Sequence, residues 1–381
     1  MSARSSVEKF QQHLHDLEVQ GRYRSLSLPH GIDLTSNDYL SLANHPLLRQ
    51  AAKDYLHNGG VIGAGGSRLL RGHCAEHEAL EAYAATFFAA PRCLYLSSGF
   101  QANITIFQAL ASRHDVIIYD EFVHASAREG IQNSHAKAYK VQHNDASAFE
   151  EMCKKAQQNI AQGSGGHIWI AVESLYSMDG DIAPLEALRA VAERYDATLI
   201  IDEAHASGAM GATGRGVSEA LIKAHGYDRI ITLHTCGKAL GVAGSILCAS
   251  QHVIDTIINV GRGFVYSTAP MPLQAHLVEC ALRIIDSDEG KERRERLYSV
   301  AKKAQQIFGG VGSYIVPLVI GNDQLCVDVA HMLQQKGWDI RAIRPPTVPV
   351  GSARLRLSLN ADLTSDMLDQ FAADYFEVNP S

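Results

Sequence analysis

Short apolar runs rich in β-branched residues alternate with longer stretches of helical period from about residue 78 to residue 250. This alternation predicts an α/β fold with a mainly parallel sheet covered by helices. The expected strands are CLYL, DVIIYD, KAYKVQ, HIWIAVES, TLIIDE, RIITLH and SILCAS, and the expected helices include residues 78–90, 100–111, 149–161, 185–195 and 217–225.

The pattern changes after about residue 285, where a charged helical stretch precedes strand-like YIVPLVI, helical VDVAHMLQQKG, strand-like ARLRLSL and a closing helix. Such mixed elements predict a second, smaller α+β domain. We therefore expect an N-terminal arm over residues 1–45, a large α/β domain over residues 46–284 and a small C-terminal domain over residues 285–381.

Composition and charge exclude several classes of protein. A chain of 381 residues with 46% apolar and 20% charged residues is typical of a globular protein. Its formal net charge of -7 argues against general binding to nucleic acid or to an anionic membrane. Seven scattered cysteines without a C-x-x-C pair indicate reduced thiols, and the N-terminus lacks an apolar signal core, so we expect a cytoplasmic protein.

Polar residues follow most of the predicted strands directly. Because the ligand site of an open parallel sheet lies beyond the carboxyl ends of its strands, we expect these residues to share one edge. In chain order they are Ser97, Ser98, Gly99 and Phe100, then His124, Ser177 and Asp179, Asp202 and His205, and Thr235 and Lys238.

The amine and the carboxylate of this set meet the needs of pyridoxal 5'-phosphate (PLP). The Lys238 amine would form an imine with the aldehyde of PLP, and Asp202 would hold its ring nitrogen protonated. His205 could reach the ring hydroxyl and His124 could stack on the ring face. Each residue also has a structural interpretation, since His124 could cap a helix and a lysine after a strand is commonly a solvated charge.

The phosphate of PLP would need backbone N–H donors at the start of a helix. Ser98, Gly99 and Phe100 would present such groups, and the Thr235 hydroxyl would add another donor. Ser98 and Gly99 could alternatively form an ordinary N-cap.

Eight stretches of the chain carry a resemblance to a known family. The sequence resembles the α-oxoamine synthases, which are PLP-dependent transferases of fold type I. Among them it is most similar to those that join L-alanine to a pimeloyl thioester in biotin biosynthesis. The matching stretches are LTSNDYLSLANHP, GAGGSRLLRGHCAEHEALE, SSGFQAN, YSMDGDIAPL, IIDEAHASGAMGATGRG, HTCGKALGVAG, FVYSTAPMP and AIRPPTVPVGSARLRLSL.

The resemblance implies the ring contacts described above and adds Ser177 beside them. It also implies a homodimer in which Ser267 and Thr268 reach the cofactor phosphate of the neighbouring subunit. The catalytic residues that we expect are Lys238, His124, Asp202 and His205.

Arginines are the candidate groups for anionic substrates. Arg354 and Arg356 alternate onto one face of ARLRLSL, and the resemblance favours Arg356 as the anchor of the amino acid's carboxylate. Arg22 with Arg24, and Arg344, are candidate partners for the distal carboxylate or for an anionic carrier.

Three features of the expected reaction stay open. Asn37 and Ser177 could stabilise developing oxyanions. The pimeloyl donor could be pimeloyl-CoA or pimeloyl-acyl carrier protein. Another member of the family, such as glycine C-acetyltransferase, would use a different amino acid and acyl chain.

Two nucleotide motifs are incomplete. The letters DEAH at 202–205 would suit a helicase, but no G-x-x-x-x-G-K-[ST] loop accompanies them. GAGGSRLLRG has Arg68 where a dinucleotide fingerprint requires its third glycine.

A zinc hydrolase is the alternative from a different class of enzyme. His73, Glu76 and His77 match H-x-x-E-H, in which the two histidines bind the metal. His77 shares a helical face with Leu80, which favours a packed structural histidine, so we expect no metal site.

Overall fold

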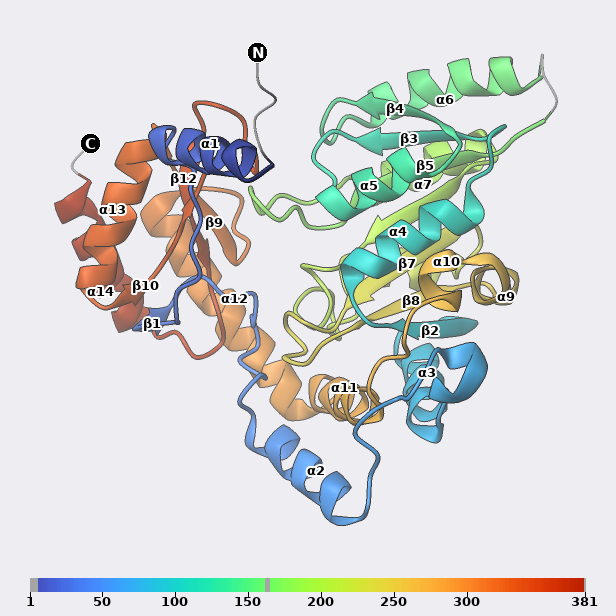
Figure 1. The fold of residues 1–381 in the computed structure, drawn as a ribbon, viewed down its shortest axis with the longest axis horizontal. Coiled ribbons are helices and arrows are strands. Elements are labelled where there is room, and N and C mark those ends of the chain that lie inside the picture. Colours follow the sequence, from blue (N-terminus) through green and yellow to red (C-terminus); the bar gives the residue numbers. More distant parts are fainter. Residues whose placement is uncertain (1–5, 162–164, 380–381) are drawn as a thin grey trace. The chain divides into compact units, whose positions relative to one another are not determined.

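The computed structural model describes residues 6–161 and 165–379, which form two compact units (Figure 1). The large unit comprises residues 37–177 and 181–297. The small unit comprises the described residues up to Ser36, the short segment Met178–Gly180 and the described residues from Tyr298 onward. Relative to the predicted boundaries, residues 37–45 and 285–297 group with the large unit.

The described part of the large unit contains one sheet of seven strands in the order β2-β8-β7-β6-β5-β3-β4. The strands β4, β3, β5, β6 and β7 run parallel, whereas β8 is antiparallel to β7 and β2. The mainly parallel sheet predicted from the sequence is confirmed. The strands are β2 Arg92–Leu96, β3 Val116–Asp120, β4 Lys137–Val141, β5 Ile168–Glu173, β6 Thr198–Asp202, β7 Ile230–Thr235 and β8 Ser245–Ala249.

Helices cover both faces of this sheet (Figure 1). One face packs against α4, α5 and α9, and the other packs against α6 and α7. The helical elements are α2 Pro46–His57, the π-helical turn η1 Arg68–Gly72, α3 Ala75–Phe87, α4 Gly99–Leu110, α5 Ala125–Asn133, α6 Ala146–Ala161, α7 Leu185–Arg194, α8 Glu219–His225, α9 Gln251–Val260, α10 Arg262–Val265 and α11 Pro272–Ile285.

The sequence analysis did not single out α2 or α9 to α11, and it suggested α5 only through a capping role for His124. In α5 the reason is visible, because the helix buries the small residues Ser126, Ala127 and Gly130. A Cβ atom added at Gly130 would lie 2.8 Å from the carbonyl oxygen of Asn103 in α4. The two helices therefore pack through small residues, which leave little hydrophobic periodicity in the sequence.

The face of the sheet beneath α4 and α5 changes character along the strands. Its middle is apolar, with Ile117, Ala171 and Ile231 in one buried cluster. Side chains on a strand alternate between faces, so the same face ends in polar groups at the carboxyl ends of the strands. These groups are Glu173 on β5, Asp202 on β6 and Thr235 on β7.

The small unit has the α+β character expected for the C-terminal part. Strands β9 Ile315–Gly321, β11 Ala342–Ile343 and β12 Ala353–Ser358 form an antiparallel sheet in the order β11-β12-β9. β1 Ile32–Asp33 pairs in parallel with β10 Trp338–Asp339, so the N-terminal residues are part of this unit. The helices are α1 Ser6–Val19, α13 Asp323–Gln335 and α14 Ser365–Val378, and α12 Asp288–Phe308 begins in the large unit. In the part of the chain that the structure describes, no helix has both the length and the apolar character needed to span a membrane.

Candidate functional site

The carboxylate of Asp202 lies at the end of β6, where it is 8% exposed. Asn103 of α4 donates from Nδ2 to Asp202 Oδ2 at 2.8 Å, and the backbone N–H of Ala204 donates to Oδ1 at 2.9 Å. Two donors of this kind stabilise a buried carboxylate in its charged form and fix its orientation. The result is a negative charge held at a defined position on the sheet edge.

Glu173 is the register partner of Asp202 on the neighbouring strand β5 and is also buried. Its Oε1 atom has no hydrogen-bond partner among the described residues. Burial, and then the charge of Asp202, raise the pKa of Glu173 to about 8, while Lys238 and the backbone N–H groups of Ser177 and His124 act in the opposite direction. The edge therefore carries two adjacent carboxyl groups, and in one of them, Glu173, burial favours the protonated form.

His124 is the N-cap of α5, as its structural interpretation predicted. Its Nδ1 atom accepts from the backbone N–H of Ser126 at 3.2 Å and lies 2.7 Å from Ser126 Oγ. Ser126 Oγ in turn accepts from Asn103, the residue that holds Asp202. His124 is an exposed residue, yet partial burial of its ring lowers the pKa of His124, which favours the neutral imidazole.

His205 lies one turn beyond Asp202 and is 5% exposed. Its Nδ1 atom is 2.7 Å from the hydroxyl of Tyr39, which donates to Asn37 Oδ1 at 3.0 Å. Asn37 and His205, predicted separately, are thus joined by one tyrosine.

The N-terminus of α4 meets the end of β7. Ser98 is the N-cap, and its Oγ accepts from the backbone N–H of Gln101 at 3.1 Å. A Cβ atom added at Gly99 would lie 3.1 Å from Thr235 Oγ1, so the glycine permits a close approach of the two elements. Phe100 is 45% exposed and points away from the core. Backbone N–H groups and a hydroxyl therefore converge where an anion could bind.

Lys238 follows β7 in a turn whose Gly241 N–H donates to the Lys238 carbonyl at 2.8 Å. The lysine is partly buried. Ser177 follows β5 in a hairpin closed by a hydrogen bond from Tyr176 N to Asp181 O at 2.9 Å, and it is 9% exposed. The edge thus combines an amine, two carboxyl groups, two imidazoles and a helix N-terminus in the large unit.

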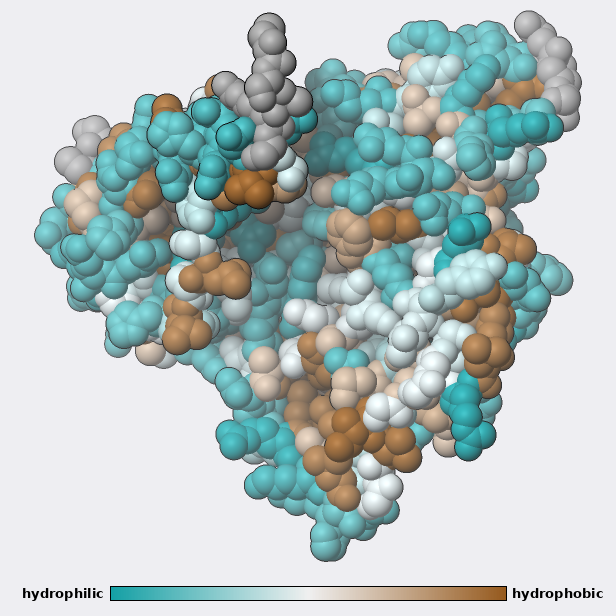
Figure 2. Space-filling view, in the orientation of Figure 1, coloured by the Kyte–Doolittle hydropathy of each residue, from teal (hydrophilic) through white to brown (hydrophobic). Residues whose placement is uncertain are grey.

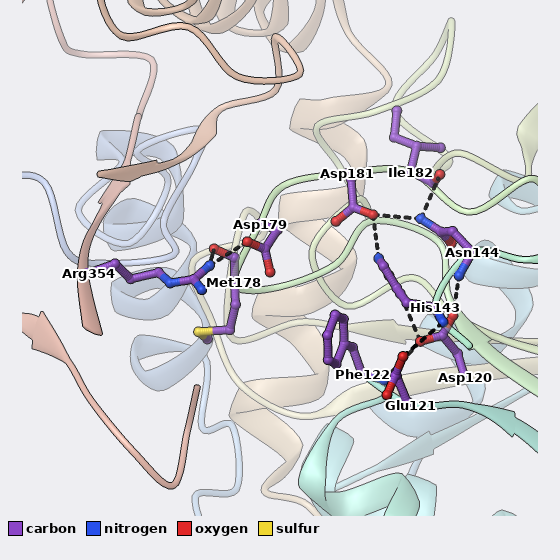
Figure 3. Close-up of polar contacts among 10 residues, drawn as sticks. All are labelled: Asp120, Glu121, Phe122, His143, Asn144, Met178, Asp179, Asp181, Ile182 and Arg354. Carbon is purple, nitrogen blue, oxygen red and sulfur yellow. Dashed lines mark hydrogen bonds and ion pairs between the residues drawn. The ribbon is translucent and has the colours of Figure 1, made fainter. Parts of the chain in front are cut away.

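His143 fixes the base of the Ser177 hairpin (Figure 3). Its Nδ1 is 2.9 Å from Asp120 Oδ1 and its Nε2 is 2.6 Å from Asp181 Oδ2. Hydrogen bonds and charge from both carboxylates outweigh burial and raise the pKa of His143 to about 10, so the ring is an imidazolium at neutral pH. The edge of Tyr176 packs on this ring. The sequence analysis did not identify this network.

The hairpin tip carries Asp179, which belongs to the small unit together with its ion-pair partner Arg354 (Figure 3). Arg354 is 5% exposed, and its Nε also donates to the carbonyl of Ser352 at 3.1 Å. Arg356 is partly exposed, and its Nη2 lies 3.1 Å from Ser358 Oγ. Of the two candidate anchors, Arg354 is therefore already bound to an internal carboxylate.

A pocket in the small unit is lined by three arginines, Arg22, Arg24 and Arg344. Arg22 forms an ion pair with Asp323 at 3.6 Å and its side chain is 32% exposed. Arg344 donates to the carbonyl of Gly21. The pocket concentrates positive charge on a protein of negative net charge, which suits an anionic ligand.

Ser267 and Thr268 lie just after α10, in a segment that reaches the surface of the large unit. Thr268 is exposed and Tyr266 is 76% exposed. The backbone N–H of Ala269 donates to Gly66 O at 2.9 Å, which attaches the segment to the loop before η1.

The H-x-x-E-H segment is built as a packed structural element. His77 is fully buried, with Nδ1 3.0 Å from Cys74 Sγ and Nε2 2.9 Å from the carbonyl of Pro270. Burial lowers its pKa to about 4. Among the residues that the structure describes, no group of three or more His, Cys, Asp or Glu side chains is arranged to hold a metal ion.

Sequence reasoning missed several members of the site, namely Asn103, Ser126, Glu173 and Tyr39. Glu173 had a signal, since it ends an apolar run two residues after Ala171 on the same strand face. Asn103 is an amide side chain among the buried residues of α4, which is a second usable signal.

Comparisons with known proteins show the family of this chain. Residues 29–374 match the family model for class I and II aminotransferases. The chain is 39% identical over 346 residues to 8-amino-7-oxononanoate synthase of Chromobacterium violaceum, covering 89% of this chain and 86% of the relative.

Solved structures share the fold. A serine palmitoyltransferase variant from S. paucimobilis, with a bound PLP–myriocin aldimine, has a TM-score of 0.87 at 24% identity and covers 99% of both chains. 8-Amino-7-oxononanoate synthase from Francisella tularensis has a TM-score of 0.73 at 27% identity, covering 91% of this chain and 97% of that one.

Proposed function

Because the chain belongs to the family of class I and II aminotransferases, and within it to the 8-amino-7-oxononanoate synthases, we propose that it is a PLP-dependent acyltransferase of biotin biosynthesis. The reaction condenses L-alanine with a pimeloyl thioester and yields 8-amino-7-oxononanoate, carbon dioxide and the free thiol carrier. The observation that carries the proposal is the buried Asp202 carboxylate, held by Asn103 on the same sheet edge as the α4 N-terminus and Lys238.

The residues of this edge fit PLP in their chemistry. Asp202 supplies a fixed negative charge suited to a protonated ring nitrogen. The space that a Cβ at Gly99 would fill, beside Thr235, suits a phosphate on the N-terminus of α4. Ser98 and Phe100 supply the flanking backbone N–H groups. His124 is exposed, and its flat imidazole suits stacking on the face of the cofactor ring.

When bound, PLP supplies an electron-poor ring that stabilises negative charge at the α-carbon of alanine. Lys238 would be the residue that holds PLP, and its amine would serve as the general base for the α-proton of alanine. Asp202 keeps the proton on the ring nitrogen, and His205 orients the ring hydroxyl from its position beside Tyr39. His124 keeps the ring in place.

The acyl transfer needs groups that hold substrate. Asn37 and Ser177 stabilise the oxyanion that develops when the thioester is attacked. Arg356 binds the carboxylate of alanine. The ion pair between Arg354 and Asp179 supports this choice between the two arginines. Arg22 and Arg344 bind the distal carboxylate or the carrier, which the three-arginine pocket supports.

We further propose a homodimer with shared active sites, in which Ser267 and Thr268 reach the cofactor phosphate of the partner subunit. Large apolar side chains are exposed near this segment, including Leu70 at 86% and Tyr266 at 76%. Figure 2 shows hydrophobic residues gathered over the loop between α2 and α3, where Val61 and Ile62 are exposed. A contiguous apolar surface of this kind is typical of an interface.

The test is a substrate panel with the PLP-loaded protein. Alanine, glycine and serine are each offered with pimeloyl, acetyl, succinyl and palmitoyl thioesters, and kcat/KM is compared. We expect the highest value for alanine with a pimeloyl thioester, and coenzyme A and acyl carrier protein are compared as carriers. A preference for glycine with acetyl-CoA would replace the proposed substrates, because a single methyl group contributes only about 1–3 kcal/mol of discrimination.

A further inference from the structure

Glu173 is a buried carboxyl group to which the mechanism above gives no role. It is the last residue of β5, and the register of the parallel pair sets it directly beside Asp202 of β6. Paired residues of adjacent strands point to the same face of a sheet. Both side chains accordingly line one small cavity, together with His124 and with Asn103 and Phe107 of α4.

The surroundings of Glu173 are not those of an ordinary structural carboxylate. It is 3% exposed, and its Oε1 atom has no hydrogen-bond partner among the described residues although it lies in a cavity with ligand-type groups. No arginine or lysine forms an ion pair with it in the described part of the large unit, whereas Asp202 holds two hydrogen bonds from neutral donors. A buried carboxyl group without an ion-pair partner favours its neutral form.

The titratable groups that face Glu173 shift its pKa in opposite directions. Asp202 of β6 raises its pKa, and Lys238 after β7 lowers it. The helices contribute neutral Asn103 from α4 and the imidazole of His124, whose own pKa is lowered, at the start of α5. The backbone N–H groups of Ser177 and His124 also face Glu173 and lower its pKa, but burial dominates.

We propose that Glu173 keeps its proton at neutral pH and acts as a positioning residue of the PLP pocket, so that Asp202 alone carries the negative charge for the ring nitrogen. This inference rests on the proposed binding of PLP. The neutral carboxyl group occupies the space beside Asp202 and faces the backbone of Ser177 and His124, which fixes three segments that contact the cofactor. A second negative charge there would compete with Asp202 for the ring-nitrogen proton.

Infrared difference spectroscopy on the PLP-free protein tests the protonation directly. Between about pH 6 and about pH 10, the carbonyl band of a protonated carboxylic acid should disappear with a midpoint near 8. The band should be missing from Glu173→Gln and unchanged in the matched control Glu151→Gln, because Glu151 is exposed. Asp202→Asn should move the midpoint to lower pH, since it removes a neighbouring negative charge.

A spectrum at about pH 6 in which wild type and Glu173→Gln have the same carboxylic-acid band would overturn the proposal. The Asp202→Asn measurement keeps Glu173 itself intact, so the test remains decisive if Glu173→Gln does not fold. If the midpoint of the carboxylic-acid band stayed unchanged in Asp202→Asn, that result would also contradict the proposal.

Fluorescence titration with PLP adds the positioning readout. Glu173→Ala should raise the Kd for PLP by roughly tenfold or more, and Glu173→Gln should restore it to within about threefold, because the amide matches the neutral acid in shape. Equal losses in both variants would contradict a neutral Glu173. If wild type itself takes up no PLP, the proposed function fails, while the infrared result on the PLP-free protein still decides the state of Glu173.

Discussion

The sheet edge of the large unit and the arginine pocket of the small unit differ in how firmly their polar groups are held. Asp202, His205 and Thr235 are each less than a tenth exposed, and all three lie within hydrogen-bond distance of neighbouring groups. Arg24 is exposed, and the Arg22 side chain is 32% exposed. The polar groups of the edge are fixed as a preorganised binding site would require, whereas the long side chains of the pocket are held less firmly.

This contrast predicts different consequences of mutation. Loss of a fixed group at the edge should affect turnover strongly, because nothing nearby can replace it. Loss of one arginine in the pocket should be partly compensated by the others. We therefore expect a small rise in KM for each single loss and a larger rise when two arginines are removed.

The largest effect is expected for Lys238→Ala. The variant should lose covalent PLP retention, and turnover should fall at least ~10³-fold because both attachment and general-base catalysis are removed. Borohydride reduction followed by mass spectrometry measures the attachment, with Lys223→Ala on the exposed side of α8 as control. If the Lys238→Ala protein still trapped PLP covalently, another amine would be the attachment site.

Asp202→Asn should retain PLP but lower kcat about 100-fold or more. A preorganised electrostatic contact of this kind contributes about 3–4 kcal/mol to the transition state. Asp228→Asn is the matched control, because Asp228 has a side chain that is 74% exposed. Near-normal turnover of Asp202→Asn would mean that the buried edge is not the preorganised site. The contrast between the edge and the arginine pocket would then be wrong.

Arg356→Lys should raise the KM for alanine about tenfold or more while kcat changes less, because a lysine cannot form the two-pronged contact with a carboxylate. Arg354→Lys should leave that KM nearer to wild type and lower stability, since Arg354 holds Asp179. Steady-state kinetics and thermal unfolding of both variants separate the two roles. The reverse ranking would make Arg354 the anchor.

The smallest effect is expected in the pocket itself. Arg344→Ala should raise the KM for the pimeloyl thioester only about threefold, and Arg22→Ala should act similarly, because the remaining arginines continue to attract the anion. The double variant should lose more, and the loss should shrink at high salt. A single-variant effect as large as that of Asp202→Asn would show that the pocket is as rigidly organised as the edge.

Much of the large unit could be predicted because its strands are nearly continuous apolar runs. HIWIAVES and TLIIDE are buried along their whole lengths as β5 and β6, apart from partial exposure at their first residues, so composition alone identified them. The edge residues were predictable for the same reason, since strand ends in a parallel sheet mark the ligand side. Their catalytic and binding roles stay predictions until the variants are measured.

What the sequence could not provide is the pairing of side chains from distant segments. Asn103 and Asp202 are 99 positions apart, and only the packing of α4 on the sheet brings them together. The same holds for Asp179 and Arg354, which are 175 positions apart and form an ion pair. Likewise, the register that sets Glu173 beside Asp202 follows from strand pairing and not from local pattern.

The parallel pairing of β1 with β10 has a consequence for synthesis of the chain. The large sheet has all its strands once residue 249 has been made, so it can assemble while translation continues. Ile32, in contrast, must wait for Trp338, about 300 residues later. On the ribosome β1 therefore emerges long before β10, and its backbone groups stay without their strand partner during that interval.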